Sequence, residues 1–566
     1  MNMRAFWWIA LAFTAMWIWF EWMKFNAAAP VDTNQIAVHA DRPADVPMAN
    51  MAIPSTQGQD ARSVDSDVPQ AVSRLDQQQR VRVVTDMLAL EIDTLGGDIR
   101  DARTLLHGMP RDRNTPFHLM GDQGPLIYYA QNGIATPASA ELPAPTHRAV
   151  YQIEQSEYRL EGDQLRVPMV WRENGIEVTK TYIFTRGSYL IDVEYQVTNT
   201  ADQIWSGSLY SQFVRTAHDP YSSRMMYTYT GPVYYDHYSD DKKYNKISFS
   251  DINSQPLENL PIQGGWAAMI QHYFVTAVVP NQNATNSYFA RPLDQGRYSI
   301  GVVEPAVSVA PGQTGTLRSQ IYIGPTEQNI LKKIAPGLER TIDYGMFTIL
   351  AEPLFWLLNH INNFIGNWGW SIIVLTILIK FAFYWLSAKS YYSMARLRKF
   401  QPKLKQLKEN YGDDKAIFQQ KMMKLYKEEK INPLGGCLPI LVQMPVFIAL
   451  YWVLIYSVEM RQSEWILWIT DLSAKDPYFI LPVLMGLTMW IQQKLNPTAM
   501  MDEMQQKVMK LLPFIFTIFF MWFPAGLVLY WLMNNILSVS QQYYITKKIE
   551  KSDAREAAEA KQNKKR

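Results

Sequence analysis

The sequence predicts a two-part membrane protein, with an all-α transmembrane bundle and a large β domain. Long apolar runs suited to helical spans are concentrated after residue 366. Residues 81–330 instead alternate apolar and polar side chains with the period of β-strands. The chain is 48% hydrophobic and yet 19% charged, which indicates a mixture of membrane-embedded and water-soluble parts.

The N-terminal 80 residues predict an anchor followed by a tether. Residues 1–25 form a short, tryptophan-rich apolar run behind Arg4, which we interpret as an uncleaved transmembrane anchor. A cleaved secretory signal is the alternative, because Ala27 opens a run of small residues that resembles a cleavage site. Residues 26–80 are rich in Ala, Pro, Asp and Gln without any period, and we expect a disordered linker.

Residues 81–330 predict one antiparallel β domain of two packed sheets. Apolar residues recur at every second position at 189–197, and glycine-containing turns punctuate the region. The histidines lack the spacing of metal ligands, so we expect a binding or scaffolding domain without catalysis. These histidines are His107, His118, His147, His218, His237 and His272. The single cysteine, Cys437, excludes an intrachain disulfide.

Two further segments lead into the bundle. Residues 337–365 carry apolar side chains at intervals of three and four, which predicts an interfacial amphipathic helix; a core helix of the β domain is the alternative. Residues 366–386 predict the second span, with Lys380 about 15 Å along it from Trp370. A lysine near the bilayer centre costs about 2.5–3.5 kcal/mol or more. It therefore either snorkels to an interface or faces a polar cavity.

The remaining chain predicts a cytoplasmic hairpin and four more spans. Residues 387–432 are rich in lysine and arginine, which places them in the cytoplasm, and their helical pattern breaks at 411–414. The predicted later spans are residues 433–458, 476–495, 511–523 and 526–546. The fifth span is short, which implies local bilayer thinning. We expect the basic tail, residues 547–566, to be disordered and cytoplasmic. It either attracts anionic lipid or ribosomal RNA or is a solvated tail without a partner.

Four short motifs resemble one family. They are Asn-Trp-Gly at 367–369, Asn-Pro-Leu-Gly-Gly-Cys-Leu-Pro at 432–439, Gln-Met-Pro at 443–445 and Trp-Phe-Pro-Ala-Gly-Leu at 522–527. Together they resemble the YidC/Oxa/Alb membrane protein insertases. The N-terminal anchor and the large β domain resemble the Gram-negative YidC form of that family.

The resemblance implies a fold, a location and partners. It implies six spans, five of them forming the core, in the bacterial inner membrane, with both termini cytoplasmic and the β domain periplasmic. The β domain is similar to the supersandwich of sugar mutarotases, without their chemistry. The implied partners are nascent membrane proteins, SecYEG, SecDF, membrane lipids and the ribosome, which the cytoplasmic hairpin and the basic tail would contact. Family members usually have arginine where this chain has Lys380, so a positive charge is required here but a guanidinium is not.

The expected mechanism is a hydrophilic groove through which polar tails of client proteins cross part of the membrane. The residues that we expect to line this groove are Lys380, Thr376, Gln443, Tyr530, Trp531 and Asn534. The residues against which a client's apolar segment would slide are Met444, Pro445 and Phe447. We expect no enzyme activity, cofactor, metal or small-molecule substrate. The spans carry no protease motif, and the chain has no nucleotide-binding loop. A secondary transporter with a periplasmic binding domain is the alternative function, but it predicts internal repeats that the sequence lacks.

Overall fold

The computed structural model describes residues 78–563 apart from 111, 125, 138, 222–227, 240–242, 412–413, 429–437 and 496–502. The predicted anchor at 1–25 and nearly all of the predicted linker lie outside the described residues. The described residues separate into two compact units, one ending at Ile342 and the other beginning at Asp343. Each unit is described by itself.

The first unit contains a large mixed sheet in which nearly all strand pairs are antiparallel. Its order is β13-β16-β17-β10-β5-β4-β3-β2-β1-β6, with β18 paired to β10. Only β1 and β6 pair in parallel among the described strands. The strands are β1 (Arg80–Val84), β2 (Leu88–Asp93), β3 (Asp98–Gly108), β4 (Pro116–Gln123), β5 (Leu126–Ala135), β6 (Glu157–Arg159), β10 (Trp205–Thr216), β13 (Leu257–Gln263), β16 (Thr285–Leu293), β17 (Arg297–Val303) and β18 (Val307–Val309).

A second, antiparallel sheet of eight strands has the order β12-β11-β14-β15-β19-β9-β8-β7. Its strands are β7 (Gln164–Glu173), β8 (Ile176–Thr185), β9 (Leu190–Asn199), β11 (Gly231–Tyr235), β12 (Tyr244–Lys246), β14 (Trp266–Gln271), β15 (Phe274–Val279) and β19 (Thr314–Pro325). Short helices α2 (Phe249–Ser254) and α3 (Gln328–Ile334) and the 3₁₀ turns η2 (Asp294–Gly296) and η3 (Leu338–Thr341) complete the unit. The predicted two-sheet architecture is confirmed.

The local sequence pattern accounts for the strands. In β9 the side chains of Ile191, Val193 and Tyr195 are buried and their neighbours are more exposed, as the period of two predicts. The β7–β8 hairpin turns at Asn174 and Gly175, whose φ angles are 47° and 79°. Positive φ at both central residues is the conformation that Asn-Gly turns favour.

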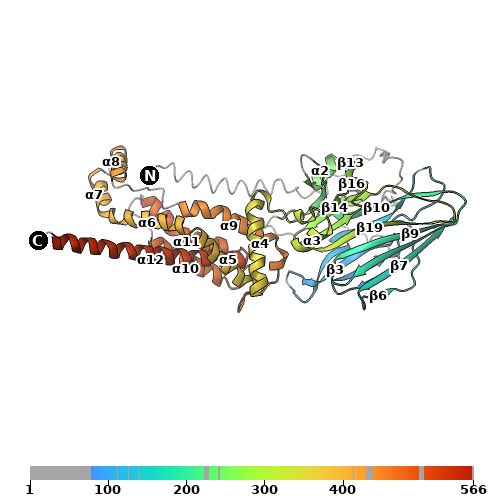
Figure 1. Ribbon diagram of the computed structural model, residues 1–566, viewed down its shortest axis with the longest axis horizontal. Coiled ribbons are helices and arrows are strands. Elements are labelled where there is room, and N and C mark those ends of the chain that lie inside the picture. Colours follow the sequence, from blue (N-terminus) through green and yellow to red (C-terminus); the bar gives the residue numbers. More distant parts are fainter. Residues whose placement is uncertain are drawn as a thin grey trace, which may run out of the picture. The chain divides into compact units, whose positions relative to one another are not determined.

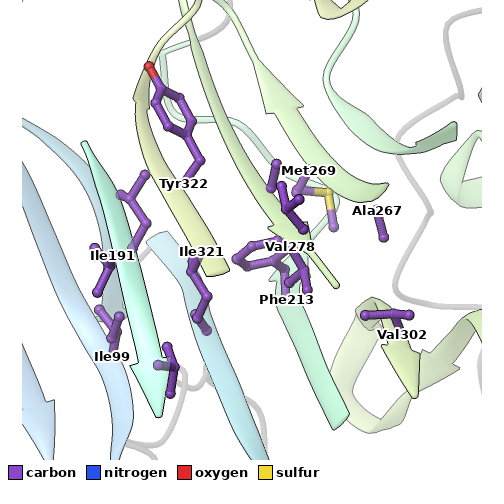
Figure 2. Packing of buried hydrophobic residues seen from close by; sticks show 14 of the residues in the cluster. Ile99, Ile191, Phe213, Ala267, Met269, Val278, Val302, Ile321 and Tyr322 are labelled. Carbon is purple, nitrogen blue, oxygen red and sulfur yellow. The ribbon is translucent and has the colours of Figure 1, made fainter. Parts of the chain in front are cut away.

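The two sheets enclose one large apolar core. Figure 2 shows side chains from both sheets in the same layer, including Phe213 of β10 beside Val278 of β15 and Ile99 of β3 near Ile191 of β9. Phe213, Val278 and Ile191 are completely buried. Because apolar area removed from water stabilises by about 25 cal/mol per Å², a core of this size can hold the domain without a disulfide.

The β unit also buries charged side chains, among them a lysine. Lys180 of β8 is fully buried, and its Nζ donates to the carbonyl oxygens of Gly96, Gly97 and Asn132 at 3.0, 2.8 and 3.2 Å. The buried carboxylate of Asp98 acts on it electrostatically. Burial lowers the pKa of Lys180 to about 7, and Asp98 offsets part of that shift. All three N–H donors of the ammonium therefore have acceptors within the domain.

The second unit is helical, and its apolar helices pack side by side (Figure 1). Contacts join α10 to α12 and α11, α12 to α5 and α6, and α4 to α5 and α9. The elements are η4 (Gly345–Phe347), α4 (Thr348–Ile365), α5 (Trp368–Ala382), α6 (Tyr384–Lys399), α7 (Gln401–Tyr411), α8 (Lys415–Glu428), α9 (Leu438–Tyr456), η6 (Val458–Met460), α10 (Ile480–Leu495), α11 (Glu503–Phe520) and α12 (Ala525–Asn563).

The second predicted span is bent where the sequence suggests a straight helix. Helix α5 ends at Ala382, and the helix that follows leaves at 66°. Lys380 consequently lies in the last turn of α5 and not in the middle of a helix. Among the described helices, none by itself is long and apolar enough to cross a bilayer, whereas α5 and the first part of α6 meet the length and hydropathy criteria as a bent pair.

Two other helix predictions differ from the structure. Helix α12 continues through Asn563, so most of the tail that we expected to be disordered is helical. Its sequence from residue 551 onward is rich in Ala, Glu and Lys, which are strong helix formers, and helix propensity outweighs the charge that suggested disorder. Helix α11 begins at Glu503, eight residues before the predicted span, because the polar turn that precedes the apolar run is also helical.

The helix at 348–365 packs on the bundle along one face. Ala351, Phe355 and Leu358 of α4 are buried, whereas Trp356 and Phe364 are exposed by 60% and 95%. An exposed aromatic face beside a packed one is typical of a helix at a membrane interface. The first part of the predicted helix, residues 338–347, instead forms the two 3₁₀ turns η3 and η4.

Candidate functional site: a buried cation in the helical bundle

The candidate site is built around Lys380 at the end of α5. Its side chain is 7% exposed, and Nζ donates a hydrogen bond of 2.7 Å to Oγ of Ser538 on α12. Within the part of the chain that the structure describes, no carboxylate forms an ion pair with this ammonium, and Ser538 is its one hydrogen-bond acceptor. Two of its three N–H donors are thus left without a protein acceptor among those residues.

Helix α12 supplies the opposing polar face. Asn534, Ser538 and Gln542 are spaced by four residues, so they lie on one side of the helix. Ser538 Oγ donates to the backbone oxygen of Asn534 at 2.7 Å, and the Asn534 side-chain oxygen accepts from Nε2 of Gln443 on α9 at 3.0 Å. Asn534 and Gln443, both predicted from the sequence, therefore meet directly, and Ser538 connects them to Lys380.

Helix α6 adds polar groups that the sequence analysis missed. Ser387, Ser390 and Tyr391 are buried, and Tyr391 hydrogen-bonds the hydroxyl of Ser538. Ser390 and Tyr391 follow Ser387 by three and four residues, and Ser538 follows Asn534 by four. Such spacing places polar side chains on one helix face and is the sequence pattern from which they could have been predicted. It was overlooked because serine is common in apolar helices, where it can bond to its own backbone. We give the name polar cluster to the residues that these hydrogen bonds join: Lys380, Tyr391, Gln443, Asn534 and Ser538.

Thr376 lies one turn before Lys380 and is buried, but its hydroxyl donates to the carbonyl oxygen of Ile372 at 2.6 Å. It therefore shares the helix with Lys380 without bonding to it. A threonine that bonds to its own backbone presents its methyl group and a weakly available oxygen to the neighbouring side chains.

An aromatic layer adjoins the polar cluster. Phe447 of α9 packs edge-to-face on Trp531 of α12, with ring centroids 4.5 Å apart, and lies 6.4 Å from the ring of Tyr530. Tyr530 is buried, whereas Met444 and Pro445, one turn before Phe447, are exposed. Of the predicted apolar contact residues, Met444 and Pro445 thus lie on the outside of the bundle, and Phe447 is part of its packing.

The described residues offer no alternative centre for metal chemistry. Among them, no group of three or more His, Cys, Asp or Glu side chains is placed to hold a metal ion. In the β unit, His147 is hydrogen-bonded through Nδ1 to the Tyr210 hydroxyl at 2.7 Å, and burial lowers the pKa of His147 to about 3. This histidine is a neutral packing element at physiological pH.

The chain thus combines a large, mainly antiparallel β-sandwich with an apolar helical bundle that buries a lysine against polar side chains. A family described as the YidC periplasmic domain matches residues 80–357, and one described as the 60 kDa inner membrane protein matches residues 360–552. The chain belongs to the YidC family.

Relatives match over nearly the whole chain. A membrane protein insertase YidC of Thioalkalivibrio sulfidiphilus is 48% identical, covering 97% of this chain and 99% of the relative. A protein of the same name from Pseudomonas fluorescens is 47% identical, covering 97% and 98%. A crystal structure of an active YidC insertase has 18% identity and a TM-score of 0.40, covering 83% of this chain and 93% of that one.

Proposed function

We propose that this chain inserts newly made membrane proteins into the bacterial inner membrane, the activity that its relatives' names state. The polar cluster is the proposed place where a client's polar tail enters the membrane. The observation that carries this proposal is the ammonium of Lys380, which is buried among apolar helices with one hydroxyl acceptor. Because burying a cation in that position costs several kcal/mol, we expect it to have a function.

The proposed topology places six spans in the inner membrane. Both termini face the cytoplasm and the β unit faces the periplasm, because the lysine-rich segment 387–432 and the basic residues after 546 are retained on the cytoplasmic side. The bent pair α5–α6 supplies the second span. The anchor at 1–25 is the first, and α9, α10, α11 and α12 supply the others.

The proposed mechanism lowers the cost of moving polar backbone through hydrocarbon. Each unsatisfied polar backbone group costs several kcal/mol there, and the side chains of Gln443, Asn534 and Ser538 provide alternative partners along part of the way. The two free N–H donors of Lys380 attract an acidic tail, since opposite charges interact more strongly where water is scarce.

Release of the client needs no external energy source in this proposal. Its apolar segment contacts the exposed Met444 and Pro445 and then moves sideways into lipid, driven by about 25 cal/mol per Å² of apolar area removed from water. The clients are nascent membrane proteins. The proposed partners are the ribosome, SecYEG, SecDF and membrane lipids, with α7, α8 and the basic end of α12 as the ribosome-facing elements.

The test compares two substitutions of the buried cation in proteoliposomes. Lys380→Ala is expected to reduce insertion of clients with acidic tails at least tenfold, the loss of about 1.4 kcal/mol or more of electrostatic attraction. Lys380→Arg keeps the charge and is expected to retain most of the activity. Circular dichroism and thermal unfolding check that both variants are folded.

Clients with neutral tails are the matched control, because they gain little from a cation. Normal insertion of acidic-tailed clients by folded Lys380→Ala would refute the role of the polar cluster. Photo-cross-linking of nascent chains to a probe at Met444, but not at the fully buried Ala449 on the same helix, is expected as independent support.

A further inference from the structure

The outward faces of α10 and α11 change from apolar to cationic at one end of the bundle. Lys494 is exposed in the last turn of α10, and Lys507 and Lys510 are exposed near the start of α11. Beyond them, the helices expose large apolar side chains: Val483, Leu487 and Ile491 on α10, and Leu511, Phe514 and Ile518 on α11. An exposed apolar face that ends in cations is the arrangement expected where hydrocarbon meets lipid headgroups.

The three lysines lie at the same level of the bundle. Nε2 of Gln493 donates to the backbone oxygen of Met509, which joins the last turn of α10 to α11. Lys494 and Lys510 directly follow these two residues in the sequence. Lys507 is a neighbour of Lys510 on the surface of α11, because residues three apart lie on one face of a helix. Two adjacent helices therefore present three ammonium groups close to one another.

An indole ring holds one of these ammonium groups on the outward face of α10. Nζ of Lys494 lies 3.5 Å from the centroid of the Trp490 ring, one turn earlier on the helix, and Trp490 is exposed. Tryptophan is enriched at the headgroup level of membranes, where its amphipathic ring suits the interface. The ring attracts the cation through its π electrons. The pair therefore keeps a positive charge at the edge of the apolar face.

Acidic residues are scarce around these lysines. The sequence has no aspartate or glutamate from 477 to 501 or from 504 to 530, so Asp502 and Glu503 are the two acids of the whole segment and its net charge is positive. Within the described part of the chain, Lys507 and Lys510 form no ion pair with another side chain. A positive charge that adjoins an apolar face is complementary to an amphiphile with an anionic head.

We propose that Trp490, Lys494, Lys507 and Lys510 bind the headgroup of an anionic phospholipid, whose acyl chains lie along the exposed apolar residues of α10 and α11. The lysines supply charge-assisted hydrogen bonds to the phosphate, and the apolar faces supply contacts for the chains. A nucleic acid would use only the lysines and would leave the adjoining apolar faces uncovered. The inference rests on the proposed function only for the side of the membrane: in the proposed topology the headgroup lies in the cytoplasmic leaflet.

The test measures the affinity of the purified full-length protein for single lipids. The protein in a neutral detergent is titrated with phosphatidylglycerol, and the bound lipid is counted by native mass spectrometry. Phosphatidylcholine with the same acyl chains reports binding to the apolar faces alone. Phosphatidylglycerol is expected to bind at least tenfold more tightly than phosphatidylcholine, which corresponds to about 1.4 kcal/mol. Raising the salt concentration from about 0.05 to about 0.5 M should reduce this preference, because salt screens exposed charges.

The main variant neutralises the three lysines together, as Lys494→Gln, Lys507→Gln and Lys510→Gln. It is expected to abolish the preference for phosphatidylglycerol while leaving phosphatidylcholine binding unchanged. Lys510→Gln alone should weaken phosphatidylglycerol binding about threefold, and Trp490→Leu, which keeps an apolar side chain, about twofold. Circular dichroism checks that each variant is folded.

The matched control neutralises three lysines on α8, as Lys421→Gln, Lys424→Gln and Lys427→Gln. These residues are exposed and are also spaced at helical intervals. The change in net charge is the same, but a long exposed apolar face does not adjoin them, so the lipid preference should be unchanged. Lys380→Ala should also leave the preference unchanged, because Lys380 is buried.

Three results would overturn the proposal. Equal affinity of the parent for the two lipids would show that the lysines mark only the edge of the membrane. An equal loss of preference in the α8 variant would show that net charge alone is responsible. An undiminished preference in the folded triple variant, together with loss of binding to a short RNA, would assign the lysines to nucleic acid.

The measurements distinguish this inference from the proposed function, because none of them uses a client protein. Failure of the lipid preference would leave the role of the polar cluster in insertion as it stands. Conversely, normal insertion by folded Lys380→Ala would refute the polar cluster and leave the lipid preference intact.

Discussion

The two units each bury a lysine, and the two lysines differ in how many hydrogen-bond acceptors surround the ammonium. Lys180 in the β unit has three carbonyl acceptors and a carboxylate nearby. It also lies among the rings of Tyr151, Tyr182 and Tyr195, at 5.7, 5.1 and 5.4 Å from their centroids.

Lys380 in the helical unit has one hydroxyl acceptor and, among the described residues, no ion-pair partner. When every N–H donor of a buried ammonium has an acceptor in the protein, none remains to bind a ligand. When some donors lack an acceptor, they can bind one. In the proposed mechanism, the number of remaining donors, and not burial as such, is what distinguishes Lys380 from Lys180 as the lysine that acts on a client.

The largest expected effect on stability follows from removing the Asp98 carboxylate, which faces Lys180. Asp98 is buried and forms a 2.9 Å salt bridge with Arg100 in addition to facing Lys180. Asp98→Ala is expected to destabilise the protein by about 3–5 kcal/mol, because two buried cations lose their compensation. Urea unfolding of the purified protein in detergent measures this loss.

Asp163→Ala, at an exposed position, is the control and should change stability by less than about 0.5 kcal/mol. Insertion per folded molecule should be unchanged in both variants if the β-unit cation is purely structural. A specific loss of insertion in folded Asp98→Ala would break the distinction between the two lysines.

A smaller effect is expected in the pH dependence of stability. The pKa of Lys180 is about 7 in the folded protein and 10.5 for an ordinary lysine. Below pH 7 both states hold the proton, and between about 7 and 10.5 only the unfolded chain does, so stability rises with pH by up to about 1.4 kcal/mol per unit. Thermal unfolding between pH 7 and 9.5 measures the slope.

Lys180→Met removes this titrating group and should flatten the rise. Lys180→Arg should flatten it too, since arginine stays charged in both states. If the stability of Lys180→Met rose with pH as steeply as that of the parent, another titrating group would be responsible for the rise. The comparison between Lys180 and Lys380 would then lose its support.

The smallest expected effect concerns the one protein acceptor of Lys380. Ser538→Ala removes the hydroxyl that holds Nζ in the polar cluster. Because an ammonium without this contact is no longer held facing the client's tail, we expect insertion of acidic-tailed clients to fall about two- to tenfold, the equivalent of the roughly 0.5–1.5 kcal/mol of a net hydrogen bond. Insertion into proteoliposomes measures it. Ser540→Ala on the same helix is the control, because Ser540 is exposed and bonds only to the Ile536 oxygen within its own helix.

The β unit was predictable because its signal is local and repeated. Alternation at residues 189–197 and the turn at Asn174-Gly175 recur as β9 and the β7–β8 hairpin. The buried Lys180 was not predicted, since it occupies a strand position whose neighbour across the core, the carbonyl-rich turn at Gly96-Gly97, is set by tertiary structure alone.

The bundle was predictable in its helices but less so in their ends. Hydropathy locates α9, α10 and α12, yet it gives no indication of the bend after Ala382, because the apolar run continues through the bend to Trp385. Lys380, Gln443 and Asn534 were found because they are polar in apolar runs. Ser538 and Tyr391 were not predicted, because serine and tyrosine are common in apolar helices and do not by themselves indicate a polar site.

The break that ends α5 has an electrical consequence. The carbonyl end of a helix carries the negative end of the helix dipole, and Lys380 is in the last turn of α5, where the Phe383 N–H donates to the Ile379 oxygen. The carbonyl end of α5 therefore supplies a weak negative field near the ammonium in place of an aspartate or glutamate, and the N-terminal end of α6, which begins at Tyr384, offsets part of it. A neighbouring carboxylate would form an ion pair with the lysine and compete with an acidic client tail for its N–H donors. A helix terminus stabilises the charge without occupying those donors.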